Sequence, residues 1–217
     1  MTVDLLAALG DEERSNLLRL AVRRRFARNE VVFHEGDPGD ALHIVMRGIF
    51  IARSASILGH SITVNVFGEG GVFGEGVLVT EGSRRSATIS ALHPGETLMI
   101  VRGEFDALRA RDPRVDRFLV SVLAERNRVL TAQVVERQNC PAESRIYRRL
   151  LGFAELSGSD EAGGWIRLGQ SDLAELAGTT RPTTNRALRR AEERGLVELA
   201  RGGIRITDLA GLTAAAH

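Results

Sequence analysis

Two short segments near the middle of the chain carry the side chains best suited to binding a small ligand. The first is Gly74-Glu75-Gly76 and the second is Arg85-Ser86-Ala87, with nine residues between Glu75 and Arg85. A carboxylate accepts hydrogen bonds, whereas a guanidinium and a serine hydroxyl donate them to an anion. The pattern therefore predicts either a site for a ligand with an anionic group or an internal Glu75–Arg85 ion pair.

A second concentration of chemistry lies near the C-terminus. Between residues 181 and 205 there are seven arginines and three acids, a local balance of +4 in a chain whose net charge is +1. None of the basic residues of the chain is a lysine, so every one carries a planar, multi-donor group that suits phosphate and guanine. The segment is predicted to bind a nucleic-acid backbone; the alternative is a solvated, charged helix.

The remaining reactive residues indicate no catalytic or metal site. Cys140 is the single cysteine, so the chain can form no internal disulfide and no thiolate-based metal site of its own. The histidines lack close metal-ligand spacing and are expected at the surface or satisfied in the core. Nothing resembles a nucleophile with its base and orienting group, so no enzyme is expected. These histidines are His34, His43, His60, His93 and His217.

The elements that must position these groups differ along the chain. Residues 4–20 have apolar residues at helical spacing around a Gly-Asp break, which predicts short helices. Residues 26–103 alternate short apolar runs with glycine-rich turns such as Asp37-Pro38-Gly39-Asp40, typical of strands of about 4 to 8 residues. A small antiparallel barrel or roll is therefore expected.

Residues 113–139 contain no glycine and have proline only at the first position, which predicts one helix of about 40 Å. Val115, Leu119, Val122 and Val129 follow three- and four-residue spacing, interrupted by Arg126 and Gln133. We expect a helix that pairs with its copy in a dimer; the alternative is a core helix packed on the roll.

The last part of the chain has the pattern of a winged helix-turn-helix. A helix is expected over 142–156, followed by two short helices joined at Gly178-Thr179-Thr180. In the second of these, Thr184, Ala187, Leu188 and Ala191 should face inward and leave the arginines outside. Residues 196–199 and 204–206, joined by a turn at 201–203, should form a two-stranded wing.

From about residue 5 to residue 208, the chain resembles transcription regulators of the catabolite activator/fumarate-nitrate regulator (CRP/FNR) family. Three motifs carry the resemblance: E-G-D-P-G-D-A-L-H-I-V-M-R-G at 35–48, G-E-x9-R-S-A, and L-A-x-L-A-G-T-T-R-P-T-T-N-R-A-L at 173–188. The implied fold is α+β. It comprises a cyclic-nucleotide-binding β-roll over 1–112, a dimerisation helix over 113–139 and a winged helix-turn-helix over 140–217.

The resemblance also implies a role for individual residues. Arg85 and Ser86 would bind the phosphate of a cyclic nucleotide, Glu75 would accept from the ribose hydroxyl, and Gly74 would let the backbone approach. The whole implied ligand set is Gly74, Glu75, Gly76, Arg85, Ser86, Ala87, Arg126, Leu130 and Thr131. The implied DNA-binding set is Thr180, Arg181, Pro182, Thr183, Asn185, Arg186, Arg189 and Arg201.

Two positions depart from the family pattern. Leu130-Thr131 stands where cAMP-responding relatives have a Thr-Ser pair facing the adenine, so Thr131 can hydrogen-bond the base edge while Leu130 can only pack. Pro182 stands where relatives have a glutamate that accepts from cytosine, so one base position should be recognised loosely or by shape. The expected effector is cAMP, with cGMP as the second choice.

The expected function is a homodimeric, ligand-gated regulator that binds palindromic double-stranded DNA and, as an activator, RNA polymerase. A constitutive regulator whose roll only dimerises stays an alternative. No apolar run approaches the roughly 18 residues of a membrane span, and the first residues carry acids where a signal peptide carries bases. The expected location is the cytoplasm, without a membrane partner and without a required cofactor.

Overall fold

A computed structural model describes residues 11–55, 61–80, 82–158 and 164–217 of the chain. These residues form two compact units: the first holds most of the described residues up to Leu130, and the second holds Thr131–His217. Of the expected N-terminal helices, α1 is observed over Asp11–Leu20, and residues 4–10 lie outside the described part. No helix in the described ranges is long and apolar enough to cross a membrane.

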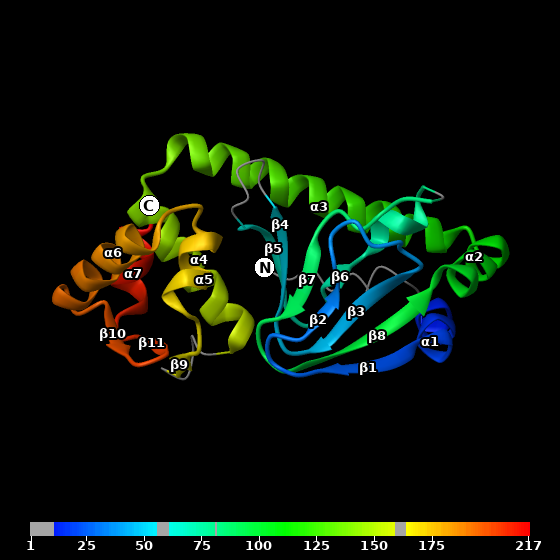
Figure 1. Cartoon of the computed structure of the whole chain (residues 1–217), viewed down its shortest axis with the longest axis horizontal. Helices are drawn as coiled ribbons and strands as arrows, with labels where there is room; N and C mark the ends of the chain where they lie inside the picture. The colour runs from blue at the N-terminus through cyan, green and yellow to red at the C-terminus, as the bar shows by residue number, and fades with distance from the viewer. Residues whose placement is uncertain (1–10, 56–60, 81, 159–163) are drawn as a thin grey trace. The chain divides into compact units, whose positions relative to one another are not determined.

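The first unit contains the predicted antiparallel roll, built from two four-stranded sheets (Figure 1). One sheet has the order β1-β8-β3-β6 and the other β2-β7-β4-β5. A short 3-10 helix, η2, follows β6, and the helix α2 follows β8. The bounds are β1 Val22–Phe26, β2 Val31–Phe33, β3 Ala41–Arg47, β4 Phe50–Ala55, β5 Ser61–Phe67, β6 Val72–Phe73, η2 Glu75–Leu78, β7 Thr88–Ala91, β8 Gly95–Val101 and α2 Arg102–Arg111.

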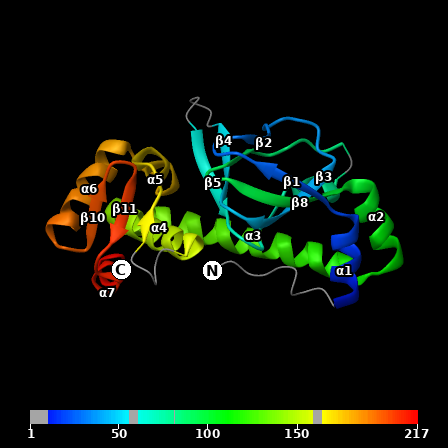
Figure 2. The same ribbon diagram turned by 90° about the horizontal axis from the view of Figure 1, so that it is seen from below.

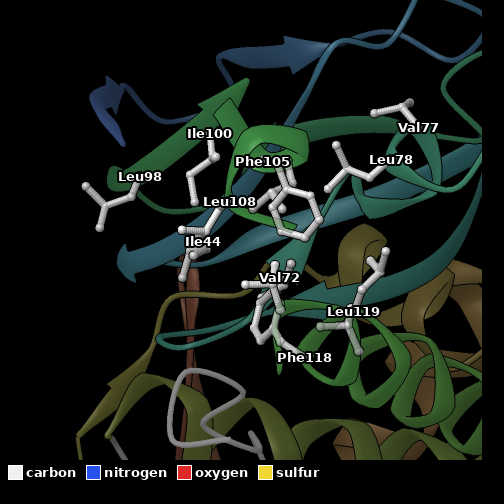
Figure 3. Close-up of a cluster of buried hydrophobic side chains, with 13 residues drawn as sticks. Ile44, Val72, Val77, Leu78, Leu98, Ile100, Phe105, Leu108, Phe118 and Leu119 are labelled. Atoms are coloured by element: carbon white, nitrogen blue, oxygen red, sulfur yellow. The ribbon is translucent and has the colours of Figure 1, made fainter. Parts of the chain in front are cut away.

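The roll is held by buried apolar side chains from both of its sheets and from the helices that follow it. Figure 3 shows one cluster, in which Phe105 of α2 lies among Leu78, Ile100 and Leu108. Burying a large apolar side chain of this kind stabilises the fold by roughly 1.5 to 3 kcal/mol. This cluster packs behind η2, the element that carries Glu75, and so fixes the backbone on which one end of the candidate site depends.

The long helix α3 spans Arg114–Asn139, as predicted, but its first part packs differently from the expectation (Figure 2). Val115, Leu119 and Val122 are 0, 5 and 3 % exposed and belong to the core cluster of the roll, together with Phe118. Their assignment to a dimer seam was therefore wrong, and the alternative of a core helix holds for this part. Spacing of three and four residues marks an apolar helix face but does not say what covers it.

The second unit has the predicted winged helix-turn-helix. Its core includes Ile146, Tyr147 and Leu150 of α4, all 0 % exposed. The wing strands β10 and β11 pair as expected, and β9, which was not predicted, adds a third strand beside β11. The bounds are α4 Ala142–Ser157, β9 Trp165–Ile166, α5 Gln170–Leu176, α6 Arg181–Glu193, β10 Val197–Ala200, β11 Gly203–Ile206 and α7 Leu209–Ala215.

Candidate functional site

The first unit contains a cavity of about 400 Å³ that gathers eight of the nine residues expected to bind the ligand. The ninth, Thr131, is exposed on α3 and is not among the lining residues. The predicted lining residues are Gly74, Glu75, Gly76, Arg85, Ser86, Ala87, Arg126 and Leu130. Eight of the residues that the family resemblance implied therefore line one cavity of this domain.

Arg85 is the buried cation of the cavity, with only 6 % of the residue exposed. Its Nη1 donates to the carbonyl oxygens of Ala41, at 2.8 Å, and Gly74, at 3.2 Å, and its guanidinium carbon lies 4.0 Å from the centre of the Phe33 ring. Its ion pair with Asp40 is long, 3.9 Å, and the side chain of Asp40 is 89 % exposed. The Nε of Arg85 is buried and has no hydrogen-bond partner among the residues that the structure describes.

The electrostatics of Arg85 favour an added anion. Burial lowers the pKa of Arg85, and the nearby carboxylates of Asp40, Asp37 and Glu75 oppose that change. The guanidinium stays protonated because arginine is effectively always charged in proteins. Among the described residues its one ion pair is long and solvent-exposed, and a buried cation in that state is costly to maintain. A bound phosphate would supply the missing charge and the missing acceptor.

Gly74 makes room for this arginine. Its φ is +81°, in the left-handed region that glycine adopts without steric cost. A Cβ at this position would lie 2.6 Å from Nη1 of Arg85 and 3.0 Å from the carbonyl oxygen of Ala41. The glycine was expected to let a ligand approach the backbone; the structure adds a second reason, the close packing of Arg85 against this turn.

Glu75 lies at the start of η2 and is 8 % exposed. Its Oε1 lies 3.3 Å from Nη2 of Arg126, which also donates to the carbonyl oxygen of Val72 at 3.3 Å. The guanidinium carbon of Arg126 lies 4.8 Å from the centre of the Phe67 ring. The ion pair that Glu75 makes is therefore with Arg126, and the alternative of a Glu75–Arg85 ion pair is not what the structure shows.

His43 is a buried histidine whose protonation is affected by the charge of Arg85. Nδ1 of His43 lies 3.0 Å from Oγ1 of Thr97, and its ring stacks on Phe73 with centres 5.1 Å apart. Burial, and then the charge of Arg85, lower the pKa of His43 to about 3. His43 is therefore neutral at physiological pH and adds no second charge beside Arg85, as expected for a satisfied core histidine.

Sequence reasoning missed the residues that form the rest of the cavity wall. Phe33, Val64 and Phe67 supply apolar surface, Ser54 supplies a hydroxyl, and Arg84 supplies an exposed guanidinium that donates to the carbonyl oxygen of Gly36. Phe33 comes from β2, far in sequence from both the Gly-Glu and the Arg-Ser segments, and Phe67 ends β5, seven residues before Gly74. Among these residues, Arg84 could have been found from the sequence, because it directly precedes Arg85.

The expected DNA-binding residues lie on α6 and on the wing of the second unit. Oγ1 of Thr180 accepts from the backbone N–H of Thr183 at 3.4 Å, so Thr180 is the predicted N-cap, and Pro182 lies in the first turn. The inward residues Thr184, Ala187, Leu188 and Ala191 are all buried, as predicted. Arg181, Arg186 and Arg189 are exposed, and Thr183 and Asn185 are half-buried.

The arginines of this surface divide into two groups. Arg190 pairs with Glu143 at 3.0 Å, and Arg205 pairs with Glu198 across the wing. In the described part of the chain, no carboxylate forms an ion pair with Arg181, Arg186, Arg189 or Arg201. Arg181 and Arg201 line the same hollow, beside Ser171 of α5. The name DNA-reading surface is used below for Arg181, Arg186, Arg189 and Arg201.

Comparisons with known proteins match both units. Residues 23–112 match the cyclic nucleotide-binding domain family, and residues 144–215 match the Crp-like helix-turn-helix domain family. The chain is 31 % identical to the cyclic AMP receptor protein of Thermus thermophilus over 206 residues, covering 95 % of this chain and 93 % of that protein. It is also 31 % identical to the CRP-like cAMP-activated global transcriptional regulator of Mycobacterium tuberculosis over 191 residues, covering 84 % and 83 %.

Among solved structures, the fold is similar to that of the c-di-GMP-responsive global regulator CLP of Xanthomonas campestris. The TM-score is 0.78 at 22 % sequence identity, covering 91 % of this chain and 99 % of the other. A likeness at this identity concerns the fold, and it agrees with the α+β architecture of a β-roll, a long helix and a helix-turn-helix.

The two domains define a DNA-binding transcription regulator with a cyclic-nucleotide-binding domain. The chain belongs to the CRP/FNR family, as its motifs had indicated. Its relatives are transcription factors, which agrees with the expectation that it is not an enzyme. Within the described ranges, no group of three histidine, cysteine or acidic residues could hold a metal ion.

Proposed function

We propose that the chain is a homodimeric regulator in which a cyclic mononucleotide, with cAMP as the first candidate, controls the binding of palindromic DNA. The single observation that carries the ligand proposal is the state of Arg85. It is 6 % exposed and, within the described ranges, its Nε has no partner and its one ion pair is a long contact with an exposed aspartate. An anion that enters the cavity would complete its hydrogen bonds and charge.

The opposite end of the cavity suits the rest of such a ligand. Glu75 offers a carboxylate to a ribose hydroxyl, with Arg126 holding that carboxylate at 3.3 Å. Ala52, Val64, Phe67 and Leu130 form an apolar wall suited to a planar base. Leu130 cannot hydrogen-bond the base edge. The preference for cAMP over cGMP is supported by the similarity of the chain to a cyclic AMP receptor protein and to a cAMP-activated regulator.

The proposed dimer places two DNA-reading surfaces on one operator. Val120, Leu130, Val134 and Val135 of α3 are 63, 41, 56 and 53 % exposed, an unusual number of large apolar side chains left on one helix. Pairing of two such helices would give the dimer a two-fold axis, and the DNA site that it recognises would then be a palindrome. Half-site centres should then lie one helical turn apart, about 34 Å.

The ligand would act by population shift. It would favour one placement of the two DNA-binding domains over others, by the difference of its affinity for the two states. When the regulator activates transcription, RNA polymerase would be a further partner. A protein that acts on chromosomal DNA in this way works in the cytoplasm of a bacterial cell, and no cofactor besides the effector is required.

Calorimetric titration of the full chain with cAMP and with cGMP tests the ligand proposal, and sedimentation of the same sample tests the dimer. We expect saturable binding of at least one of the two nucleotides, one per chain, by a protein that sediments as a dimer. The absence of heat and of thermal stabilisation at millimolar concentrations of both would contradict the ligand proposal and favour a roll that serves dimerisation only.

A further inference from the structure

One face of α3 combines apolar residues with a single amide. The positions Val120, Leu123, Asn127, Leu130 and Val134 follow one another at spacings of three, four, three and four residues. Leu123 is half-buried, whereas Val120, Leu130 and Val134 are 63, 41 and 56 % exposed and Asn127 is exposed. This set is called the α3 seam below. In heptad terms, it has Val, Asn and Val at a and Leu at d.

The α3 seam borders the face that packs on the roll, and its half-buried member Leu123 also packs against that core. Val115, Phe118, Leu119 and Val122 occupy that other face and are at most 5 % exposed. Their neighbours in the roll already cover them, so they are not available to a second molecule. Figure 2 shows this part of α3 running along the roll with one side against the strands. The α3 seam is what remains for an additional partner.

Nothing in the isolated chain accounts for Asn127. Asparagine is a poor helix former, and position 127 is well inside a helix of 26 residues. In the described part of the chain, its amide has no hydrogen-bond partner, unlike Asn139, whose Nδ2 donates to the carbonyl oxygen of Val135 at 2.9 Å near the helix end. Asn127 thus costs helix stability, and no hydrogen bond with the described residues offsets that cost, which is the reason to look for a partner in a second molecule.

We propose that Asn127 pairs with Asn127 of a second copy and thereby fixes the parallel, in-register arrangement of two α3 helices. The proposal rests on the proposed function, because it assumes the homodimer. Valine at a with leucine at d favours two parallel strands, and one asparagine at a specifies register and strand number at some cost in stability.

The chemistry of the amide explains the selectivity. Each asparagine side chain is both a donor and an acceptor, so two copies facing each other across a two-fold axis can satisfy one another. A shift by one heptad, or an antiparallel pairing, would place each amide against valine or leucine. Burying an amide without a hydrogen bond is unfavourable, so wrong registers are disfavoured.

The register would also determine a wall of the nucleotide cavity. Leu130, at the next d position, lines the cavity, and Arg126, which immediately precedes Asn127, makes the ion pair with Glu75. A slip of the paired helices would change what lies against Leu130 beside the ligand. Asn127 is thus a positioning residue: it touches no ligand, but it fixes the helix that supplies two of the cavity's residues.

Stability of the dimer gives the first test, in the full chain. Asn127→Leu should lower the dissociation constant of the dimer by about tenfold or more, since an apolar residue at a removes the cost of the buried amide. Ala132→Leu is the matched control, because Ala132 is exposed on α3 outside the α3 seam, and it should leave dimerisation unchanged. An unchanged or weaker dimer in Asn127→Leu would overturn the inference.

Register gives the second test. In a Cys140→Ser background, Val120→Cys places one thiol per chain in the α3 seam, seven residues before Asn127. With Asn127 present, mild oxidation should link most chains into a single covalent dimer, and adding Asn127→Leu should lower that fraction. Ala132→Cys in the same background should not cross-link.

The two failures are distinguishable. A wild-type chain that sediments as a monomer contradicts the homodimer of the proposed function and the inference with it. A wild-type dimer in which Val120→Cys does not cross-link, or cross-links equally well with leucine at position 127, contradicts only the role of Asn127. Nucleotide binding by the Asn127→Leu dimer completes the comparison: a positioning role predicts weaker binding in spite of a more stable dimer, whereas a purely structural role predicts no change.

Discussion

The cavity of the roll and the DNA-reading surface use arginine in opposite ways. In the cavity Arg85 is 6 % exposed and is held by two carbonyl oxygens, an aromatic ring and a glycine without which it would not fit. On the DNA-reading surface Arg181, Arg186 and Arg201 are exposed and have no ion pair in the described ranges. A small ligand needs one preorganised cation, whereas a DNA backbone needs several that can adjust.

The difference has an energetic consequence. A buried, charge-assisted contact is worth more per residue than an exposed one, because water and salt do not screen it. Replacing a single residue in the cavity should therefore abolish a function, while replacing one in the DNA-reading surface should weaken it. The predictions below run from the largest expected effect to the smallest.

Arg85→Ala should have the largest effect on the ligand. The loss of a desolvated contact between a guanidinium and a phosphate should cost about 2 to 4 kcal/mol, or two orders of magnitude or more in affinity for cAMP. Arg84→Ala is the matched control, since Arg84 is an exposed arginine of the same cavity. Calorimetric titration measures the affinity of both variants for cAMP. Equal losses of affinity would show that the buried and the exposed arginine contribute alike, against the prediction.

Arg186→Ala should affect one base pair of the operator. On the exposed side of α6, a guanidinium can bind O6 and N7 of a guanine together, a contact worth about 1 to 3 kcal/mol of discrimination. Selection of binding sites from random DNA should give a two-fold symmetric motif with one or two G·C pairs per half. The variant should lose preference at a single position of each half. Equal weakening on all sequences would show that Arg186 binds only the backbone.

His43→Phe should change how stability depends on pH. Because burial lowers the pKa of His43 to about 3, the folded state binds fewer protons than the unfolded state, whose histidine titrates near 6.5. Stability is fully present above pH 6.5 and is lost as the pH falls toward 3. The loss at pH 5 should be up to about 2 kcal/mol in the wild type and absent in the variant. Denaturant unfolding at pH 7 and pH 5 measures the difference, and parallel curves would contradict it.

Arg201→Ala in the wing should have the smallest effect. It removes one exposed contact with a phosphate, so it should weaken binding to all sequences alike by less than about 1 kcal/mol. The slope of log affinity against log salt should become shallower by about 1. Titrations of one operator and one unrelated duplex at several salt concentrations measure both quantities. Loss confined to the operator would instead give Arg201 a role in base recognition.

The sequence was sufficient to predict the parts whose information is local. The turn residues predicted the roll, the Gly-Glu and Arg-Ser-Ala segments marked two parts of the cavity wall, and Thr180 with Pro182 correctly marked the start of α6. These features depend on capping, turn chemistry and short-range order, which a linear pattern contains. The partner of Glu75, Arg126, lies on another element; the family resemblance had placed Arg126 at the ligand site, but turn chemistry could not supply the ion pair.

Three expectations differ from the structure because of arrangements in space that a linear pattern does not contain. The face of α3 that was expected in the dimer lies against the roll instead. Val115, Leu119 and Val122 have the spacing of an apolar face, and that spacing is the same whether the roll or a second copy covers them. Phe33 reaches the cavity from β2, which pairs with the distant strand β7, and Phe67 reaches it from the end of β5. Thr131 follows Leu130 directly, but successive residues on a helix point in different directions. Of these two residues, Leu130 lines the cavity and Thr131 does not.

The most direct test of the account is the affinity of the full chain for its selected operator, measured at one salt concentration with and without saturating cAMP. Coupling between two sites of one protein is typically worth 1 to 3 kcal/mol, so cAMP should raise the affinity of the wild type for DNA by about 5- to 150-fold. cAMP should not change the DNA affinity of Arg85→Ala, which should equal the DNA affinity of the wild type without cAMP. Equal DNA affinity of the wild type with and without cAMP and cGMP would contradict the account.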